Sequence, residues 1–257
     1  MRDVADQPKT LKRPIIGAVV ALVAGFLVFF GLNAWEMRPA NLDAQFEQGM
    51  TSEPGVAPLF EVFKRDFPND YATFKAEMIG KFKSGGDSGA LRLAAFNWMR
   101  AFSTRHIPQV AAAPSANIRA FIEAQDVALK ALANESTAMC GHYAMTGLQP
   151  ADRPGPAAAA AVGNAAAVQL RAASAGIKHP TQRAEPTAQD SQQLFGKMTE
   201  LGMTAHQRDV FAGPGGPAAA SVEDQCQIGM LLYKAVGALP EPVADRITDE
   251  LIRSMGR

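Results

Sequence analysis

The sequence is poor in cysteine, histidine, tyrosine and tryptophan, and it has no excess of either charge. Its 257 residues include two cysteines, four histidines, three tyrosines and two tryptophans, with 25 basic and 25 acidic side chains. A chain without net positive charge lacks the electrostatic footprint that nucleic acid requires, so we expect no nucleic acid partner. No segment alternates polar and apolar residues over the length of a strand, and no repeat of fixed period occurs.

Alanine is the abundant residue, at 47 of 257 positions. Alanine has the highest helix propensity, whereas strands favour β-branched and aromatic residues. Apolar residues recur at helical spacing over most of the chain after residue 58. The sequence therefore predicts an all-α protein, with a helical-bundle-like domain of seven or eight helices at 58–257.

One long apolar run precedes this domain. Ile15 to Leu32 holds 18 residues without a charge or a strongly hydrogen-bonding side chain. At 1.5 Å per residue this run forms about 27 Å of helix, just enough to cross a bilayer core. We expect a single transmembrane anchor at 14–35, after a cytoplasmic tail at 1–13. A juxtamembrane linker at 36–57 would follow, with at most a short helix at 41–50.

The charges on either side of the run predict its orientation. Four basic residues precede it, and the first basic residue after it is Arg38. The positive-inside rule then places the N-terminus in the cytoplasm and the C-terminal domain in the periplasm of a bacterial inner membrane. A cleaved signal peptide is the alternative, but the apolar core is longer than usual and Leu32 stands where cleavage needs a small residue.

Small residues form a stripe within the expected anchor. Gly17, Ala21 and Gly25 recur at every fourth position. Such a stripe lets two helix backbones approach closely in lipid, so these residues are a candidate surface for a homodimer. Because glycine and alanine are common in membrane helices, the alternative is that the anchor is only a tether to the lipid bilayer.

The two cysteines, Cys140 and Cys226, both fall on expected inward helix faces. The expected periplasmic location is oxidising and so favours their pairing. We therefore expect a disulfide between these two residues, which are 86 positions apart in the sequence. The alternative is two separate buried thiols that act as small apolar residues.

No residue pattern predicts catalysis or a bound cofactor. Cys140-Gly-His142 was considered as a thiol nucleophile or part of a metal site, but the spacing matches neither arrangement. The other histidines, His106, His179 and His206, are isolated in the sequence. We therefore expect no catalytic, cofactor or metal site.

The charge is unevenly distributed along the chain. Residues 64–119 hold nine basic and four acidic side chains. This segment is interpreted as a solvated face, with contact to anionic lipid headgroups as the alternative.

Periodicity and capping residues set the expected helix ends. One helix should end before Pro108. Another, with Ser115 as its N-cap, should run to Cys140 until Gly141 ends it. Ser221 is the expected N-cap of the helix that carries Cys226. Ile177 and Val222 should face inward.

These features favour a membrane-anchored, non-catalytic interaction or envelope-organising module with a protein partner. The alternative is an extracytoplasmic enzyme, either a hydrolase or a thiol-dependent protein, with a cleft that the sequence does not reveal. A pocket with convergent polar groups would support the enzyme, and an exposed apolar surface would support the interaction module.

Overall fold

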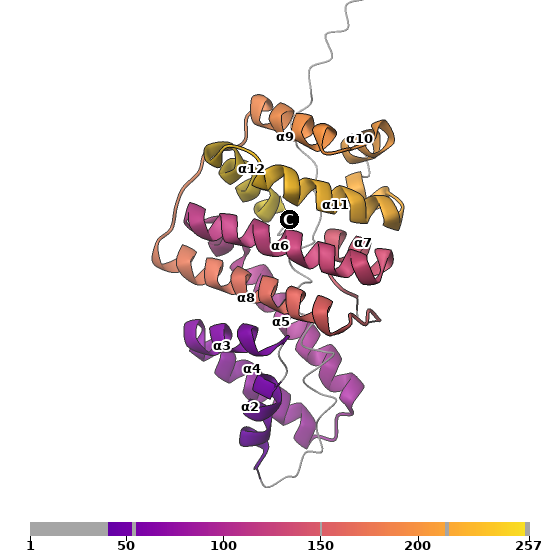
Figure 1. Cartoon of the computed structure of the whole chain (residues 1–257). Coiled ribbons are helices and arrows are strands. Elements are labelled where there is room, and N and C mark those ends of the chain that lie inside the picture. Colours follow the sequence, from indigo (N-terminus) through magenta and orange to yellow (C-terminus); the bar gives the residue numbers. More distant parts are fainter. Residues whose placement is uncertain (1–40, 53–54, 150, 214–215, 255–257) are drawn as a thin grey trace, which may run out of the picture.

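The computed structural model describes residues 41–52, 55–149, 151–213 and 216–254. Every regular element in these ranges is a helix, which confirms the all-α class (Figure 1). The described ranges contain eleven α-helices and one short 3-10 helix: α2 (Leu42–Ser52), α3 (Ala57–Asp66), α4 (Pro68–Lys83), α5 (Ser88–Ala111), α6 (Ser115–Glu135), α7 (Thr137–Met145), α8 (Pro156–Lys178), α9 (Ala188–Glu200), α10 (Ala205–Ala212), η2 (Gly216–Ala219), α11 (Val222–Gly237) and α12 (Glu241–Ser254).

The helices are stacked, with α2 and α4 at one end of the molecule and α9 and α10 at the other (Figure 1). The helix pair α6 and α8 forms the centre of the stack. On one side α8 packs against α3 and α5, and on the other α6 packs against α7 and α11. Since α12 returns to contact α5, segments far apart in the sequence share one core.

The alanine-rich segment forms α8, and most of its alanines are fully buried. Small side chains let the neighbouring helices approach closely. At Gly176 the approach is so close that an added Cβ would lie 1.9 Å from the backbone oxygen of Gln109 on α5. Ile177, which was expected to face inward, is 53% exposed because it points away from this contact.

A cluster of aromatic rings holds α3, α4 and α5 together. The ring centroids of Phe63 and Phe102 are 4.9 Å apart, and those of Phe74 and Trp98 are 5.1 Å apart. Most of the pairs are tilted or edge-to-face, as the ring quadrupole favours. These contacts join the three helices into one part of the core.

The segment expected to be a linker carries α2, and α2 is part of the core. Leu42, Phe46 and Met50 on α2 are 7%, 1% and 3% exposed. They recur at every fourth position, so they share one helix face. The folded part of the chain therefore begins by Leu42 and not near residue 58.

The expected count of seven or eight helices is too low, partly because the helix expected from Ser115 to Cys140 is two helices. Ser136 adopts an extended backbone, with φ −160° and ψ 118°, and its hydroxyl accepts a hydrogen bond from the Met139 amide at 3.3 Å. Ser136 thus starts α7 as an N-cap. The end expected before Pro108 is also wrong, because α5 continues through this proline to Ala111.

No helix in the described ranges has the length and apolar character needed to cross a bilayer. The anchor expected at 14–35, with its stripe of Gly17, Ala21 and Gly25, lies outside those ranges, as does the tail at 1–13.

Candidate functional site

The structure joins the two cysteines. Cys140 on α7 and Cys226 on α11 form a disulfide with their Cα atoms 5.0 Å apart, as the sequence analysis expected. Both residues are buried, at 0% and 3% exposure. The described ranges contain no free cysteine, so the thiol-dependent alternative has no free thiol there.

Two glycines bring α7 and α11 close together on either side of the disulfide. A Cβ added at Gly141 would lie 2.4 Å from the backbone oxygen of Val222, and one added at Gly229 would lie 2.5 Å from the Cβ of Ala144. Gly141 therefore lies inside α7 and does not end a helix, contrary to expectation. Val222, at the start of α11, was expected to face inward but is 39% exposed; its backbone oxygen and its Cγ1 atom both lie against Gly141.

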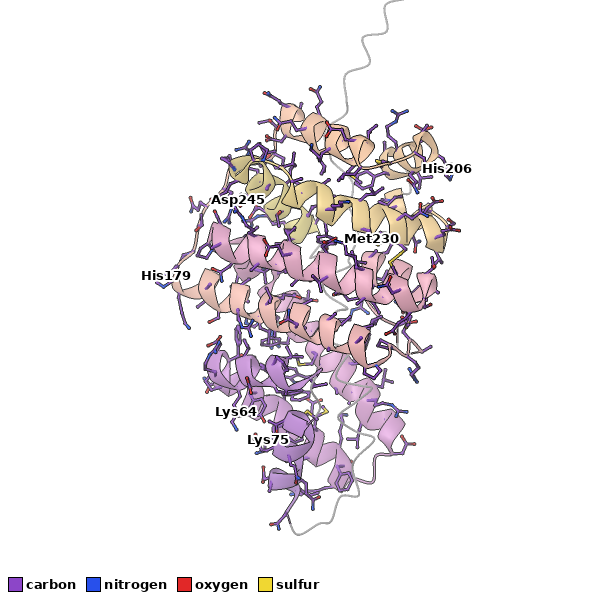
Figure 2. The ribbon with its side chains drawn as sticks, viewed as in Figure 1. Lys64, Lys75, His179, His206, Met230 and Asp245 are labelled. Carbon is purple, nitrogen blue, oxygen red and sulfur yellow. A yellow bond between two sulfur atoms is a disulfide. The ribbon has the colours of Figure 1, made fainter. Side chains whose placement is uncertain are left out.

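The histidines do not converge on a site. His142 places its Nδ1 atom 3.1 Å from Asp152, which also accepts a hydrogen bond from the Gln149 amide at 2.6 Å and so fixes the loop after α7. His179 and His206 lie at separate corners of the molecule (Figure 2). Within the described ranges no three metal-binding side chains come together.

Two partly buried ion pairs attach the segment around α9 to α12. Asp190 is 2% exposed and accepts two hydrogen bonds from Arg246, at 2.7 and 2.9 Å. Arg183 donates to Asp245 at 3.3 Å and to the backbone oxygens of Ala111 and Ala113 at 2.9 and 2.6 Å. These polar groups are satisfied by each other, so they position elements and are not a reactive site.

The sequence analysis does not predict the ion pair between Asp190 and Arg246, although one local signal marks the position of Asp190. Thr187 and Asp190 form a capping box at the start of α9, and a Thr-x-x-Asp spacing marks such a start. The arginine that completes the contact comes from 56 residues later, which no local pattern predicts.

The basic excess at 64–119 is partly neutralised by α2. Glu47 accepts hydrogen bonds from Lys64 at 2.8 Å and from Lys75 at 3.0 Å, and Lys75 also lies 2.9 Å from Asp43. The acidic partners were missed because they precede the basic segment in the sequence. Because its excess positive charge is partly neutralised, the segment 64–119 is a weaker candidate for binding anionic lipid headgroups.

The described part of the structure contains a small internal cavity and a larger open groove. The internal cavity has a volume of about 20 Å³ and lies between α6, α7, α11 and α12, with almost wholly apolar walls. Such a volume holds roughly one water molecule, so it is too small for a substrate.

The larger cavity is an open groove of about 480 Å³ where α4 meets the start of α2; six of its seven lining residues belong to α4 and one, Asp43, belongs to α2. Ala72, Ala76 and Gly80 are small residues at every fourth position of α4, and a Cβ added at Gly80 would meet nothing within 4 Å. The side chain of Lys83, at the end of α4, makes no ion pair with another described residue. The groove is lined by Asp43, Ala72, Lys75, Ala76, Ile79, Gly80 and Lys83.

Comparison with known proteins does not supply a function. No protein-family model matches the chain, and no match is found among curated proteins or solved structures. Function has to be inferred from the groove, the disulfide and the expected anchor.

Proposed function

We propose that the protein is a non-catalytic interaction module, tethered to the bacterial inner membrane by residues 14–35 with its helical body in the periplasm. We further propose that the groove between α2 and α4 receives an amphipathic helix from a protein partner in the envelope. The observation that carries this proposal is the open groove of about 480 Å³. Its volume lies within the usual range of binding pockets, about 300–1,000 Å³.

The lining of the groove favours a helical occupant with acidic residues. The small residues Ala72, Ala76 and Gly80 leave room for another helix backbone to approach α4, and Ile79 adds an apolar contact. At one end Lys83 supplies a positive charge that is exposed and makes no ion pair among the described residues. An acidic side chain on the partner would complement this charge and fix its register.

The position of the groove also supports a partner close to the membrane. Asp43 lines the groove, and only five residues lie between Asn41 and Trp35 at the end of the expected anchor. The six residue-to-residue steps that join them reach about 20 Å when fully extended. A helix of another envelope protein that emerges from the same membrane could therefore meet the groove within about 20 Å of the membrane surface.

The disulfide between Cys140 and Cys226 is consistent with the periplasmic placement. Disulfides persist in oxidising compartments and are rare in the reducing cytoplasm. The bond is therefore compatible with the orientation that the basic residues ahead of residue 14 predict.

The proposal is tested with two matched glycines. Gly80 and Gly196 both lie exposed on α-helices, and a Cβ at either would meet nothing within 4 Å. A photo-crosslinking residue at position 80 would first identify the partner in intact cells. The purified partner should then bind Gly80→Leu at least about tenfold more weakly than the wild type, since a leucine there would fill the groove.

The control variant Gly196→Leu adds the same side chain on α9, at the opposite end of the molecule. It should bind the partner within about twofold of the wild type, because surface substitutions away from an interface have small effects. Equal affinity of the wild type, Gly80→Leu and Gly196→Leu would exclude the groove as the binding site.

A further inference from the structure

We infer that the helix bound in this groove runs antiparallel to α4, with its N-terminal turn and an acidic side chain beside Lys83. The inference names the orientation and the charge pattern of the partner helix, and it rests on the proposed function of the groove. Three features of α4 carry it: the positions of its charges, the hydrogen bonds of its last turn and the space along its small residues.

The positive charge in the groove is left without a partner at one position. The Nζ atom of Lys75 lies 2.9 Å from Asp43 and 3.0 Å from Glu47, so this charge is neutralised. Lys83 also lines the groove, is exposed and makes no ion pair in the described part of the chain. Eight residues, about 12 Å along the helix axis, separate the two lysines on α4. An acidic side chain of the partner is therefore favoured at the C-terminal end of α4.

The last turn of α4 does not need the side chain of Lys83. A lysine near a helix C-terminus can bind the last carbonyl groups or balance the negative end of the helix dipole. Here backbone amides already bind these carbonyl groups. The amide of Ser84 donates to the Gly80 oxygen at 3.1 Å, and that of Gly86 donates to the Lys81 oxygen at the same distance. Lys81 also supplies a positive charge to this turn from outside the groove, so the Lys83 ammonium group is available to a partner.

The helix dipoles then favour one of the two possible orientations. Acidic side chains are most favourable in the first turn of a helix, where the dipole is positive. An acidic residue that meets Lys83 from the first turn of the partner places that N-terminus beside the C-terminus of α4, so the two helices are antiparallel. Opposite ends of the two dipoles also meet in this orientation. In the parallel orientation the acidic residue would lie in the last turn of the partner, where the dipole opposes it.

The small residues of α4 indicate where the partner comes closest. Ala72, Ala76 and Gly80 follow the groove at every fourth position, which is the spacing of a ridge on a helix surface. A Cβ added at Gly80 would meet nothing within 4 Å, so the space beside this residue is open. Since Gly80 lies one turn before Lys83, a helix that approaches closely there brings its first turn within reach of the lysine.

The experiment maps the contact in intact cells with the full chain. Thr73 and Lys81 follow Ala72 and Gly80 in the sequence, are exposed and do not line the groove. A diazirine-bearing residue at position 73 or 81 therefore leaves the groove open. Mass spectrometry of the crosslinked peptides should place the contact of position 81 about eight residues nearer the N-terminus of the partner than the contact of position 73. The reverse order would mean a parallel helix and would overturn the inference.

Charge reversal tests the role of Lys83 with a matched control. Lys83→Glu should weaken binding of the partner captured at position 81 by about fivefold at about 50 mM NaCl, with a smaller effect at about 500 mM. Lys81→Glu makes the same change in the same turn but outside the groove, and it should bind within about twofold of the wild type. A lysine in place of the acidic residue in the partner's first turn should restore binding to Lys83→Glu. Equal affinities of Lys83→Glu and Lys81→Glu would contradict the inference.

Failure of this inference and failure of the proposed function give different results. Normal partner binding by Gly80→Leu would exclude the groove as the binding site, and the inference with it. Weakened binding by Gly80→Leu, combined with crosslinks in the reverse order, would leave the groove as the binding site and exclude the antiparallel orientation. Weakened binding by Gly80→Leu, combined with equal affinities of the two lysine variants, would exclude the acidic contact with Lys83.

Discussion

Gly229 on α11 lies so close to Ala144 on α7 that any side chain on the glycine would overlap the alanine: an added Cβ would be 2.5 Å from the Cβ of Ala144. The Cβ of an alanine cannot rotate away, so the two helices would have to separate. The disulfide between Cys140 and Cys226 crosses the same interface. Close backbone packing and a covalent bond therefore act together at one place.

Gly229→Ala should lower the free energy of unfolding by about 1–3 kcal/mol, the usual cost of overpacking a core. The matched change Gly196→Ala adds the same methyl group on α9 without a contact, and it should stabilise the protein by about 0.5–1 kcal/mol through helix propensity. Urea denaturation followed by circular dichroism measures both. Similar midpoints for the two variants would show that α7 and α11 are not packed as described.

Replacement of both cysteines tests the bond across this interface. The 86-residue separation implies a stabilisation near the upper part of the usual range, so Cys140→Ala with Cys226→Ala should lower the free energy of unfolding by about 2–5 kcal/mol. Wild-type protein treated with a reducing agent should unfold at a similar urea concentration to the double variant. A wild type whose midpoint does not change on reduction would contradict the pairing.

The helical class and several helix ends were predictable because their signals are local. Thr204 and Ser221 cap α10 and α11 through hydrogen bonds from the amides of Gln207 and Asp224, three residues on in each case. The expected cap at Ser221 is therefore confirmed. The disulfide was predictable from the expected oxidising compartment and the even cysteine count.

The predictions from sequence are wrong where contacts between distant segments determine the helix ends or the shape of the surface. Pro108 remains inside α5 because Val110 and Ala111, which follow it, are fully buried. Ser115, expected to be an N-cap, is instead the first residue of α6, and its hydroxyl donates to Asp245 on α12. The groove was not predictable either, since it depends on how α2 lies against α4 and no sequence pattern specifies that distance.

Asp190 and Arg246 give a prediction for the dependence of stability on pH. Hydrogen bonds from Arg246 outweigh burial and hold the pKa of Asp190 well below its ordinary value. Because this pKa is lowered by folding, the stabilisation is present above the unfolded pKa of about 4 and is lost as the pH falls below it.

Asp190→Asn should therefore lower the free energy of unfolding at neutral pH by about 2–4 kcal/mol, since it leaves Arg246 without its charged partner. The difference between wild type and variant should shrink as the pH is lowered from about 5 toward 2. Denaturation curves at several pH values measure it. A difference that stays constant over this range would mean that the ion pair contributes nothing to stability.

The small-residue stripe of the expected anchor predicts self-association. Gly17→Ile and Gly25→Ile would block close approach of two backbones and should each reduce the signal of a bacterial two-hybrid assay on the isolated span. Val20→Ile lies away from the stripe and is the control. Equal signals from all three variants would leave the anchor as a tether only.

We propose that a membrane anchor holds the helical body in the periplasm, and reporter fusions after Arg257 test this proposal most directly. Alkaline phosphatase folds only in an oxidising compartment, whereas green fluorescent protein that is exported unfolded through the membrane does not fluoresce. We expect high phosphatase activity in the membrane fraction and no fluorescence. Fluorescent cells without phosphatase activity would place the body in the cytoplasm and contradict the anchor orientation, the proposed envelope partner and the tether.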